Sequence, residues 1–173
     1  MGGIDGLNED SEGPSHQVTL SGYWIYKYEV TVAQYRSFCT ATGHALPEFP
    51  IHYSWAGKTG WAEPALQQHP IVNVRWSDAK EYADWAGVML PTEAQWEYAA
   101  RGSQRYNYPW GGIGTVSDKE NGWDSEKCAN HYNSEIFGNS TWPVGSFPAG
   151  TSWCGAQDMA GNVREFCADW WGK

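Results

Sequence analysis

Apolar side chains recur at helical spacing in three short segments of the chain, and capping residues mark where each segment begins. The first segment follows Thr31 and Gln34, which have the spacing of a capping box, and it stops at Gly43 after about 11 residues. Its inward positions lie three or four residues apart and are Val32, Tyr35, Phe38 and Cys39. The pattern predicts an amphipathic helix over this segment.

The second segment begins near Ser77, which can cap a helix whose first turn holds Asp78 and Glu81. Acidic side chains are favoured there because the amino end of a helix carries partial positive charge. Gly87 is expected to end this helix in a left-handed conformation. The positions expected to face the core are Ala79, Tyr82, Ala83 and Ala86.

The third segment repeats the capping box with Thr92 and Gln95, and Gly102 is expected to supply a left-handed stop. Trp96 and Glu97 within it are interpreted as packing and polar bracing rather than as catalytic residues. The positions predicted to share one face of this helix are Ala94, Tyr98 and Ala99.

The remainder of the chain shows no helical period. Residues 18–28 alternate weakly, and the aromatic rings at 23–28 suit a strand that is buried on one face. From residue 43 to residue 70 the composition turns to His, Pro, Gly and Trp without a sustained period, which predicts a long irregular excursion inside one domain. Together these patterns indicate an α+β domain with little regular secondary structure.

Composition and charge narrow the class of protein. The chain has 173 residues, the usual size of one domain, with 12 Trp, 10 Tyr and 20 Gly, so we expect residues 1–173 to form a single domain of large rings set among tight turns. A net charge of −9 argues against nucleic acid as a partner. No apolar run reaches the roughly 18 residues of a membrane span. No signal peptide is recognisable, which leaves a secreted and a cytoplasmic location open.

The four cysteines, Cys39, Cys128, Cys154 and Cys167, lack the Cys-x-x-Cys spacing of a zinc or thioredoxin-like site. Two interpretations stay open: a disulfide between Cys154 and Cys167 that staples the loop between them, or buried free thiols that act as small apolar residues. The five histidines show neither metal-ligand spacing nor a nearby nucleophile motif. We expect them to lie at the surface or to form hydrogen bonds.

Residues 158–165 have the chemistry of a cation site. Asp158 and Glu165 stand on either side of a turn that contains Gly161, where backbone carbonyls can converge. Carboxylate and carbonyl oxygens are the ligands that Ca²⁺ takes. The alternative interpretation is that both carboxylates accept hydrogen bonds from backbone amides and brace the turn without a metal.

Ordered blocks of sequence carry a family resemblance; they are residues 23–31, 69–76, 90–102, 143–148 and 158–171. The most specific blocks read LPTEAQWEYAARG at 90–102 and DMAGNVREFCADWW at 158–171. The chain resembles the formylglycine-generating enzyme, or sulfatase-modifying factor, family. The resemblance implies an irregular α+β fold related to C-type lectins, with three short helices around small antiparallel sheets. It also implies that the family's first strand and its C-terminal catalytic part lie outside this chain.

The resemblance further implies two structural calcium sites. The ligands of the first would be the side chains or the backbone carbonyls of Asp158, Gly161, Val163 and Glu165. The second would use the side chain of Asn130 and the carbonyl of His131. Relatives often carry Asn at the first ligand position, and Asp158 keeps the oxygen donor while adding a charge.

Enzymes of this family oxidise a substrate cysteine to formylglycine with molecular oxygen, using two cysteines that hold copper(I), a soft cation that thiolates prefer. No cysteine of this chain occupies that place in the pattern, so the resemblance assigns no catalytic residue here. It implies an oxidase only if the missing cysteine pair is supplied, and copper is expected only in that case. The pattern therefore leaves open whether the chain is an enzyme.

The alternative function is a non-catalytic ligand- or protein-binding module of the C-type-lectin-like class, either a retroelement variable protein or an assembly subunit. Trp55 and Trp61 are the expected contact surface, because exposed Trp side chains supply much of the energy of protein interfaces. The partner would be a protein or peptide, or a second chain that covers unpaired backbone and apolar rings and completes the fold.

Overall fold

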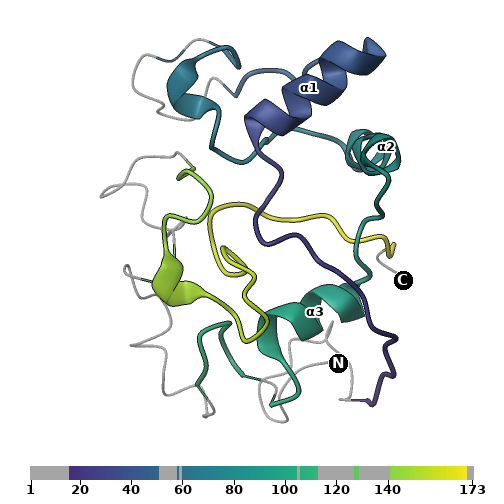
Figure 1. Cartoon of the computed structure of the whole chain (residues 1–173), viewed down its shortest axis with the longest axis vertical. Helices are drawn as coiled ribbons and strands as arrows, with labels where there is room; N and C mark the ends of the chain where they lie inside the picture. The colour runs from purple at the N-terminus through teal and green to yellow at the C-terminus, as the bar shows by residue number, and fades with distance from the viewer. Residues whose placement is uncertain are drawn as a thin grey trace.

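The computed structural model describes residues 16–50, 58, 60–104, 106–112, 127–128 and 141–170. Within these ranges the chain forms the helices α1 Val32–Thr42, α2 Trp76–Ala86 and α3 Glu93–Arg101, together with the 3-10 turns η1 Pro64–Leu66 and η3 Pro148–Gly150. In Figure 1, α1 and α2 lie together in the upper half and α3 lies below them, while most of the remaining chain is irregular.

Helix α1 confirms the capping prediction at both ends. The Thr31 hydroxyl accepts a hydrogen bond from the Gln34 backbone N–H, and the Gln34 side chain accepts one from the Thr31 N–H at 2.9 Å. Gly43 ends the helix with φ 78° and ψ 7°, in the left-handed region. The buried side chains of the helix are the predicted ones, Val32, Tyr35, Phe38 and Cys39.

Helix α2 begins at Trp76, two residues earlier than the Ser77 cap implies. The carboxylate of Asp78 accepts a hydrogen bond from the Arg75 backbone N–H at 2.9 Å, so an acidic side chain inside the first turn satisfies the amide that precedes the helix. Ser77 is already helical, and its hydroxyl donates to Asp78. Tyr82 and Ala83 are buried as predicted, whereas the other two inward positions, Ala79 and Ala86, are half-buried.

Helix α3 has the predicted capping box at Thr92, and of its predicted inner face Ala99 is buried whereas Ala94 is half-buried. Ala99 and Ala100 are its buried residues, and the Tyr98 side chain is 37% exposed. Trp96 packs against the core, and Glu97 accepts from Arg101 at 2.6 Å, so both act as scaffolding. The residue after the helix, Gly102, has φ 64° with ψ −173°, which is not a left-handed helical stop.

Two separate groups of buried apolar residues form the core. The larger lies around α1 and α2 and contains Val32, Tyr35, Phe38, Cys39, Trp61, Leu66, Ile71, Val72 and Tyr82. Its rings interlock, as in the stacked pair Tyr35 and Tyr82 with centroids 5.8 Å apart. The smaller group lies under α3 and contains Ala99, Ala100, Ala156 and Met159. The short side chains of this second group allow the C-terminal segment to approach α3 closely.

The predicted strand at residues 18–28 is not formed, and the described residues contain isolated bridges, such as that between Thr31 and Pro70, in place of the small sheets. The backbone of this region instead makes single hydrogen bonds to distant loops. Gln157 N–H donates to the Lys27 carbonyl at 2.9 Å, and the Val30 carbonyl accepts from another loop. Trp24 is fully exposed as a result.

The long excursion between residues 43 and 70 folds back onto the larger core group. The Trp61 indole N–H donates to the Pro47 carbonyl at 2.8 Å, and the Trp61 ring lies against Phe49 with centroids 5.0 Å apart. Trp61 is only 5% exposed, so the expectation of an exposed contact residue is not met there. Trp55, the other residue of that expected surface, lies outside the described residues.

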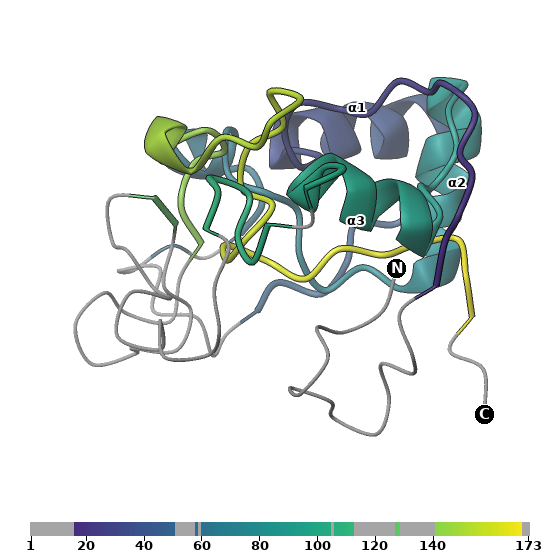
Figure 2. The same cartoon turned by 90° about the horizontal axis from the view of Figure 1, so that it is seen from below.

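The C-terminal segment runs between α2 and α3, as the yellow trace shows in Figures 1 and 2. Hydrogen bonds join it to both sides: the Trp76 indole N–H donates to the Cys167 carbonyl at 2.8 Å, and the Ala168 N–H donates to the Pro91 carbonyl at 2.8 Å. This placement brings residues 158–165 to the centre of the molecule. No helix in the described ranges is long and apolar enough to cross a bilayer.

Candidate functional site: a buried carboxylate loop

The segment predicted to hold a cation is a sharply turning loop. Asp158 and Asn162 have φ angles of 61° and 56°, and Gly161 has φ 93°, all in the region that residues other than glycine rarely adopt. Asp158 is buried, and its Oδ2 accepts a hydrogen bond from the Gly145 N–H at 2.6 Å. This bond braces the loop against a second turn, as the metal-free interpretation expects for one of the two carboxylates.

Asn162 ties the loop to two other parts of the chain. Its Oδ1 accepts from the Trp142 N–H at 2.9 Å, and its Nδ2 donates to the Trp142 carbonyl at 3.2 Å. The same Nδ2 donates to Oε2 of Glu29 at 2.7 Å. The side chain therefore closes a network between residues that are far apart in the sequence, and it holds the strained loop in one conformation.

Three carboxyl groups influence one another around this loop. Burial raises the pKa of Asp158, and the Gly145 amide lowers it in part. Burial also raises the pKa of Glu165 to about 7, with the Asp158 charge as a further cause. For Glu29, burial and then the charges of Asp158 and Glu165 raise the pKa to about 9. Ionising the three groups together is therefore costly without a cation.

Glu165 is exposed as a residue, but its carboxyl group is poorly solvated. The residue as a whole is exposed to solvent, yet protein atoms surround its carboxyl group densely enough for burial to be the main cause of its raised pKa. The two observations concern different things, because exposure sums over the whole residue while the pKa responds to the surroundings of the carboxyl group.

The donor set of this loop fits a hard divalent cation. Asp158 and Glu165 would supply carboxylate oxygens, and Gly161 and Val163 would supply carbonyl oxygens, the ligand types that Ca²⁺ prefers. In addition, Oε1 of Glu29 is buried and has no hydrogen-bond partner. Among the described residues, no group of three or more His, Cys, Asp or Glu side chains could hold a metal. The backbone carbonyls would therefore have to complete the coordination.

Glu29 and Asn162 are the residues of this site that the sequence patterns missed. Glu29 closes the aromatic block at residues 23–28, where a lone acid among rings is an unusual choice that signals a buried partner. Asn162 gave no signal of its own. The residues of the second predicted calcium site, Asn130 and His131, lie outside the described residues.

No disulfide joins Cys154 to Cys167, and the thiols of Cys39, Cys154 and Cys167 are free. The thiols of Cys39 and Cys154 donate to carbonyls of different segments, those of Ala45 and Ala99. Burial raises the pKa of Cys167 to about 11, with nearby acidic side chains as further causes. A thiol with a raised pKa is a poor nucleophile and a poor ligand for a soft metal at neutral pH.

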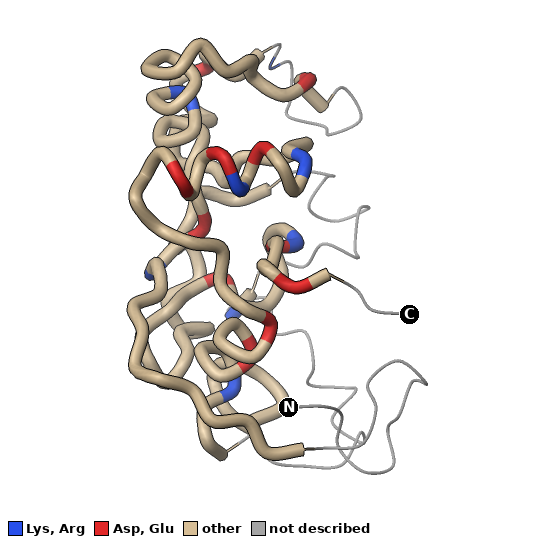
Figure 3. Tube along the Cα trace, turned by 90° about the vertical axis from the view of Figure 1, so that its right-hand side faces the viewer, with Lys and Arg blue, Asp and Glu red and all other residues tan. Residues whose placement is uncertain are grey.

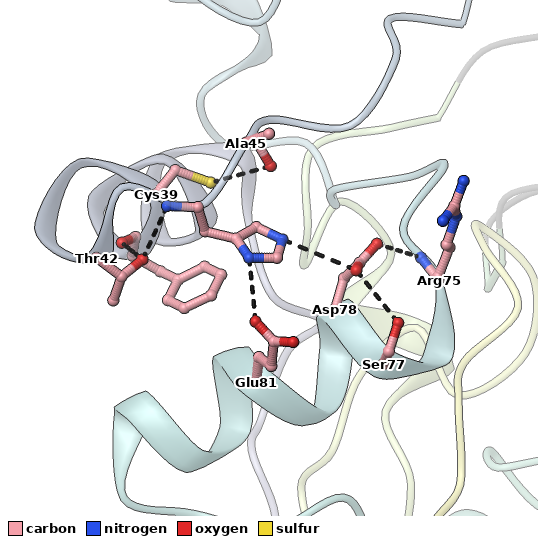
Figure 4. A network of polar contacts seen from close by, with 9 residues as sticks. Cys39, Thr42, Ala45, Arg75, Ser77, Asp78 and Glu81 are labelled. Atoms are coloured by element: carbon pink, nitrogen blue, oxygen red, sulfur yellow. Dashed lines mark hydrogen bonds and ion pairs between the residues drawn. The ribbon is translucent and has the colours of Figure 1, made fainter.

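A second polar network lies between α1 and α2. His44 follows the end of α1, and its ring lies near the side chains of Asp78 and Glu81, which Figure 4 shows on α2. The distances are 3.1 Å from Nδ1 to Glu81 and 3.8 Å from Nε2 to Asp78. An open pocket of about 400 Å³ lies beside it, with Phe38 and Trp85 in its wall. The network joins two helices and brings no nucleophile or metal-ligand set together.

The comparisons with known proteins agree with the sequence blocks and with the helices that carry them. The chain matches the sulfatase-modifying factor enzyme 1-like domain over residues 1–173. A match of that extent shows the family, and the chain belongs to the sulfatase-modifying factor enzyme 1-like family.

Two relatives are named formylglycine-generating enzymes, and a third is named a protein kinase. The chain is 36% identical to the formylglycine-generating enzyme of Thermomonospora curvata, over 99% of this chain and 68% of that protein. It is 35% identical to the formylglycine-generating enzyme of Streptomyces coelicolor, over 96% of this chain and 63% of that protein. It is also 35% identical to the serine/threonine-protein kinase Pkn1 of Chlamydia trachomatis, over 96% of this chain but 26% of that protein.

Proposed function

We propose that this chain is the larger part of a formylglycine-generating domain, which oxidises a substrate cysteine to formylglycine once the family's C-terminal cysteine pair is supplied. The single observation that carries the proposal is the identity of 36% to a formylglycine-generating enzyme over 99% of the chain. The chain spans about two thirds of that relative's length, so the remaining third would contribute the reactive cysteines. The residues of this chain would then supply the scaffold.

The cysteines of this chain do not fit the copper site of such an oxidase. Copper(I) requires converging thiolates, whereas the thiols of Cys39 and Cys154 donate to carbonyls of separate segments. The pKa of Cys167 is raised to about 11 by burial, which favours the protonated thiol. We therefore assign no copper ligand and no catalytic step to these residues.

Reconstitution tests the proposed oxidase. The chain is mixed with a second polypeptide that carries the C-terminal cysteine pair. Copper(I), oxygen and a peptide containing Cys-x-Pro-x-Arg are then added. Any aldehyde formed is trapped with a hydrazide and detected by mass spectrometry. We expect aldehyde in the complete mixture and none when either polypeptide is omitted. Absence of aldehyde in a mixture in which the two polypeptides form a stable complex would refute the proposal.

We further propose that residues 158–165 bind one structural Ca²⁺. The side chains of Asp158 and Glu165 and the carbonyls of Gly161 and Val163 would hold the ion. The raised pKa values of the two carboxyl groups support the proposal, since a cation would relieve the cost of ionising them. Bound calcium would rigidify the loop and with it the segment between α2 and α3.

Calorimetric titration of the chelator-treated chain with CaCl₂ tests this site. We expect one saturable binding event, which is lost in Asp158→Asn and in Glu165→Gln. The matched control is Glu48→Gln, because Glu48 is exposed and away from the loop, and it should bind as the unaltered chain does. Equal binding by all four proteins would contradict the assignment.

A non-catalytic binding module is the second candidate, because several large rings of the described residues are exposed. Trp24 is fully exposed, and the residue Trp170 is 79% exposed. A protein or peptide partner, or a second chain that completes the fold, would cover such rings. Light scattering distinguishes this candidate: a Trp24→Ala variant that dissociates an observed assembly would favour it, and a stable monomer would oppose it.

A further inference from the structure

Glu29 is a buried acid whose contacts point to the cation loop. The residue is 8% exposed and lies two positions before the Thr31 cap of α1. Its Oε2 accepts a 2.7 Å hydrogen bond from Asn162 across 133 positions of sequence, and the backbone amide of Val163 also stabilises its charged form. Its other oxygen, Oε1, is buried and has no partner. Buried polar atoms are normally hydrogen-bonded, so the unpaired Oε1 needs an explanation.

The contacts of Glu29 fall between the proposed cation ligands. Asn162 is flanked by Gly161 and Val163, whose carbonyls would face the ion. Asn162 has a φ of 56°, and in an asparagine such a conformation persists when the surrounding structure holds it in place. Glu29 and the Trp142 backbone are the groups that hold the Asn162 side chain. A change at Glu29 would therefore affect the carbonyls of Gly161 and Val163 through Asn162.

We propose that Glu29 is a positioning residue of the calcium site at residues 158–165, which it orients through Asn162. The inference rests on the calcium site proposed above. Outer-shell groups of this kind orient the direct ligands, and their loss typically lowers metal affinity about 10- to 100-fold. Glu29 would not need to touch the ion, which agrees with the lack of a three-carboxylate cluster in the described residues.

Calcium titrations of the chelator-treated chain test the role of Glu29. Glu29→Ala removes the acceptor of the Asn162 hydrogen bond, and Asn162→Ala removes its donor. We expect each variant to bind calcium about 10-fold more weakly or worse. In the double variant we expect a loss well below the product of the two single losses, because both changes disable one route.

Thermal unfolding with and without calcium supplies a readout that does not depend on activity. The calcium-induced rise in Tm should shrink in Glu29→Ala and should remain in the control Glu48→Ala. If Glu29→Ala does not fold, Asn162→Ala tests the same link from its other end. Calcium affinity equal to that of the control would overturn the inference, and so would fully multiplicative losses in the double variant. Absence of calcium binding by the unaltered chain would instead refute the underlying site.

Discussion

At the scale of single residues, the structure separates side chains whose polar groups are satisfied from those that are buried without a partner. The Tyr35 hydroxyl and Oε1 of Glu29 are both buried and unpaired. Of these two residues, Glu29 is the one beside the loop at residues 158–165. Tyr35 lies in the larger core group between Phe38 and Tyr82, where its ring packs against theirs. Burying its hydroxyl without a hydrogen bond costs free energy.

Replacement of Tyr35 separates these two contributions. We expect Tyr35→Phe to leave the free energy of unfolding unchanged or to raise it by up to about 1 kcal/mol, since no hydrogen bond is lost. Tyr35→Ala should lower it by about 3–5 kcal/mol, because a cavity replaces the ring. Urea denaturation followed by circular dichroism measures both. A loss in Tyr35→Phe as large as that in Tyr35→Ala would show that the hydroxyl has an essential partner.

Gly150 is required for close approach of two segments rather than for a special φ angle. A Cβ atom at this position would overlap the carbonyl of Lys127, a backbone group that cannot move alone. We therefore expect Gly150→Ala to lower the free energy of unfolding by at least about 2 kcal/mol. Gly22→Ala is the control, since nothing lies within 4 Å of its Cβ position. Equal stability of the two variants in a urea titration would contradict this packing.

At the scale of elements, helix starts depend on which side chain satisfies the first free amides. Thr31 and Thr92 cap α1 and α3 as their capping boxes predict. Helix α2 is the informative exception, because the carboxylate of Asp78 reaches back to the Arg75 amide while Ser77 is already in the helix. In the sequence both residues are polar and lie near the start of the helix. The structure shows that Asp78 makes the capping contact.

Alanine substitutions in the first turn of α2 test this assignment. We expect Asp78→Ala to lower the free energy of unfolding by about 1 kcal/mol, the usual cost of losing a capping contact. Ser77→Ala should cost less than about 0.5 kcal/mol. A larger loss from Ser77→Ala than from Asp78→Ala would reverse the assignment.

At the scale of the whole molecule, the excess of acidic residues matters most where it is buried. Figure 3 shows Asp and Glu over more of the described trace than Lys and Arg. Most of these acids face solvent, and in water they contribute chiefly to solubility. The group around residues 158–165 differs, because Glu29 and Asp158 are buried and each raises the cost of ionising the others. Its charge state couples global stability to pH and to cations.

The pH dependence of stability follows from the raised pKa of Glu29. Its pKa is about 9 in the folded chain against an ordinary value of 4.5, so its contribution is fully present below about 4.5 and is lost as pH rises through about 9. In a chelating buffer we therefore expect the free energy of unfolding to fall between pH 7 and pH 9. Glu29→Gln should flatten this fall. A stability that rises over the same range, measured by urea titration, would contradict the assignment.

The three helices and the turn at residues 158–162 could be predicted because their signals are local. The two residues of a capping box lie three positions apart, and a helical face repeats within four. Thr31, Gln34 and Gly43 therefore mark the ends of α1 without help from distant residues. The strand at residues 18–28 was wrong for the opposite reason. A strand requires a neighbour, and the backbone of that region bonds singly to loops instead. Alternating residues alone do not create a ladder.

The sequence by itself determined the family, the three helices and the acidic loop at residues 158–165, since ordered motifs and short-range spacing are properties of the chain alone. Only the tertiary structure decided that Trp61 is buried and that Glu29 meets Asn162 across 133 positions. The physical reason is that burial and pairing between distant residues depend on how the irregular segments return to the core. No local period encodes that path.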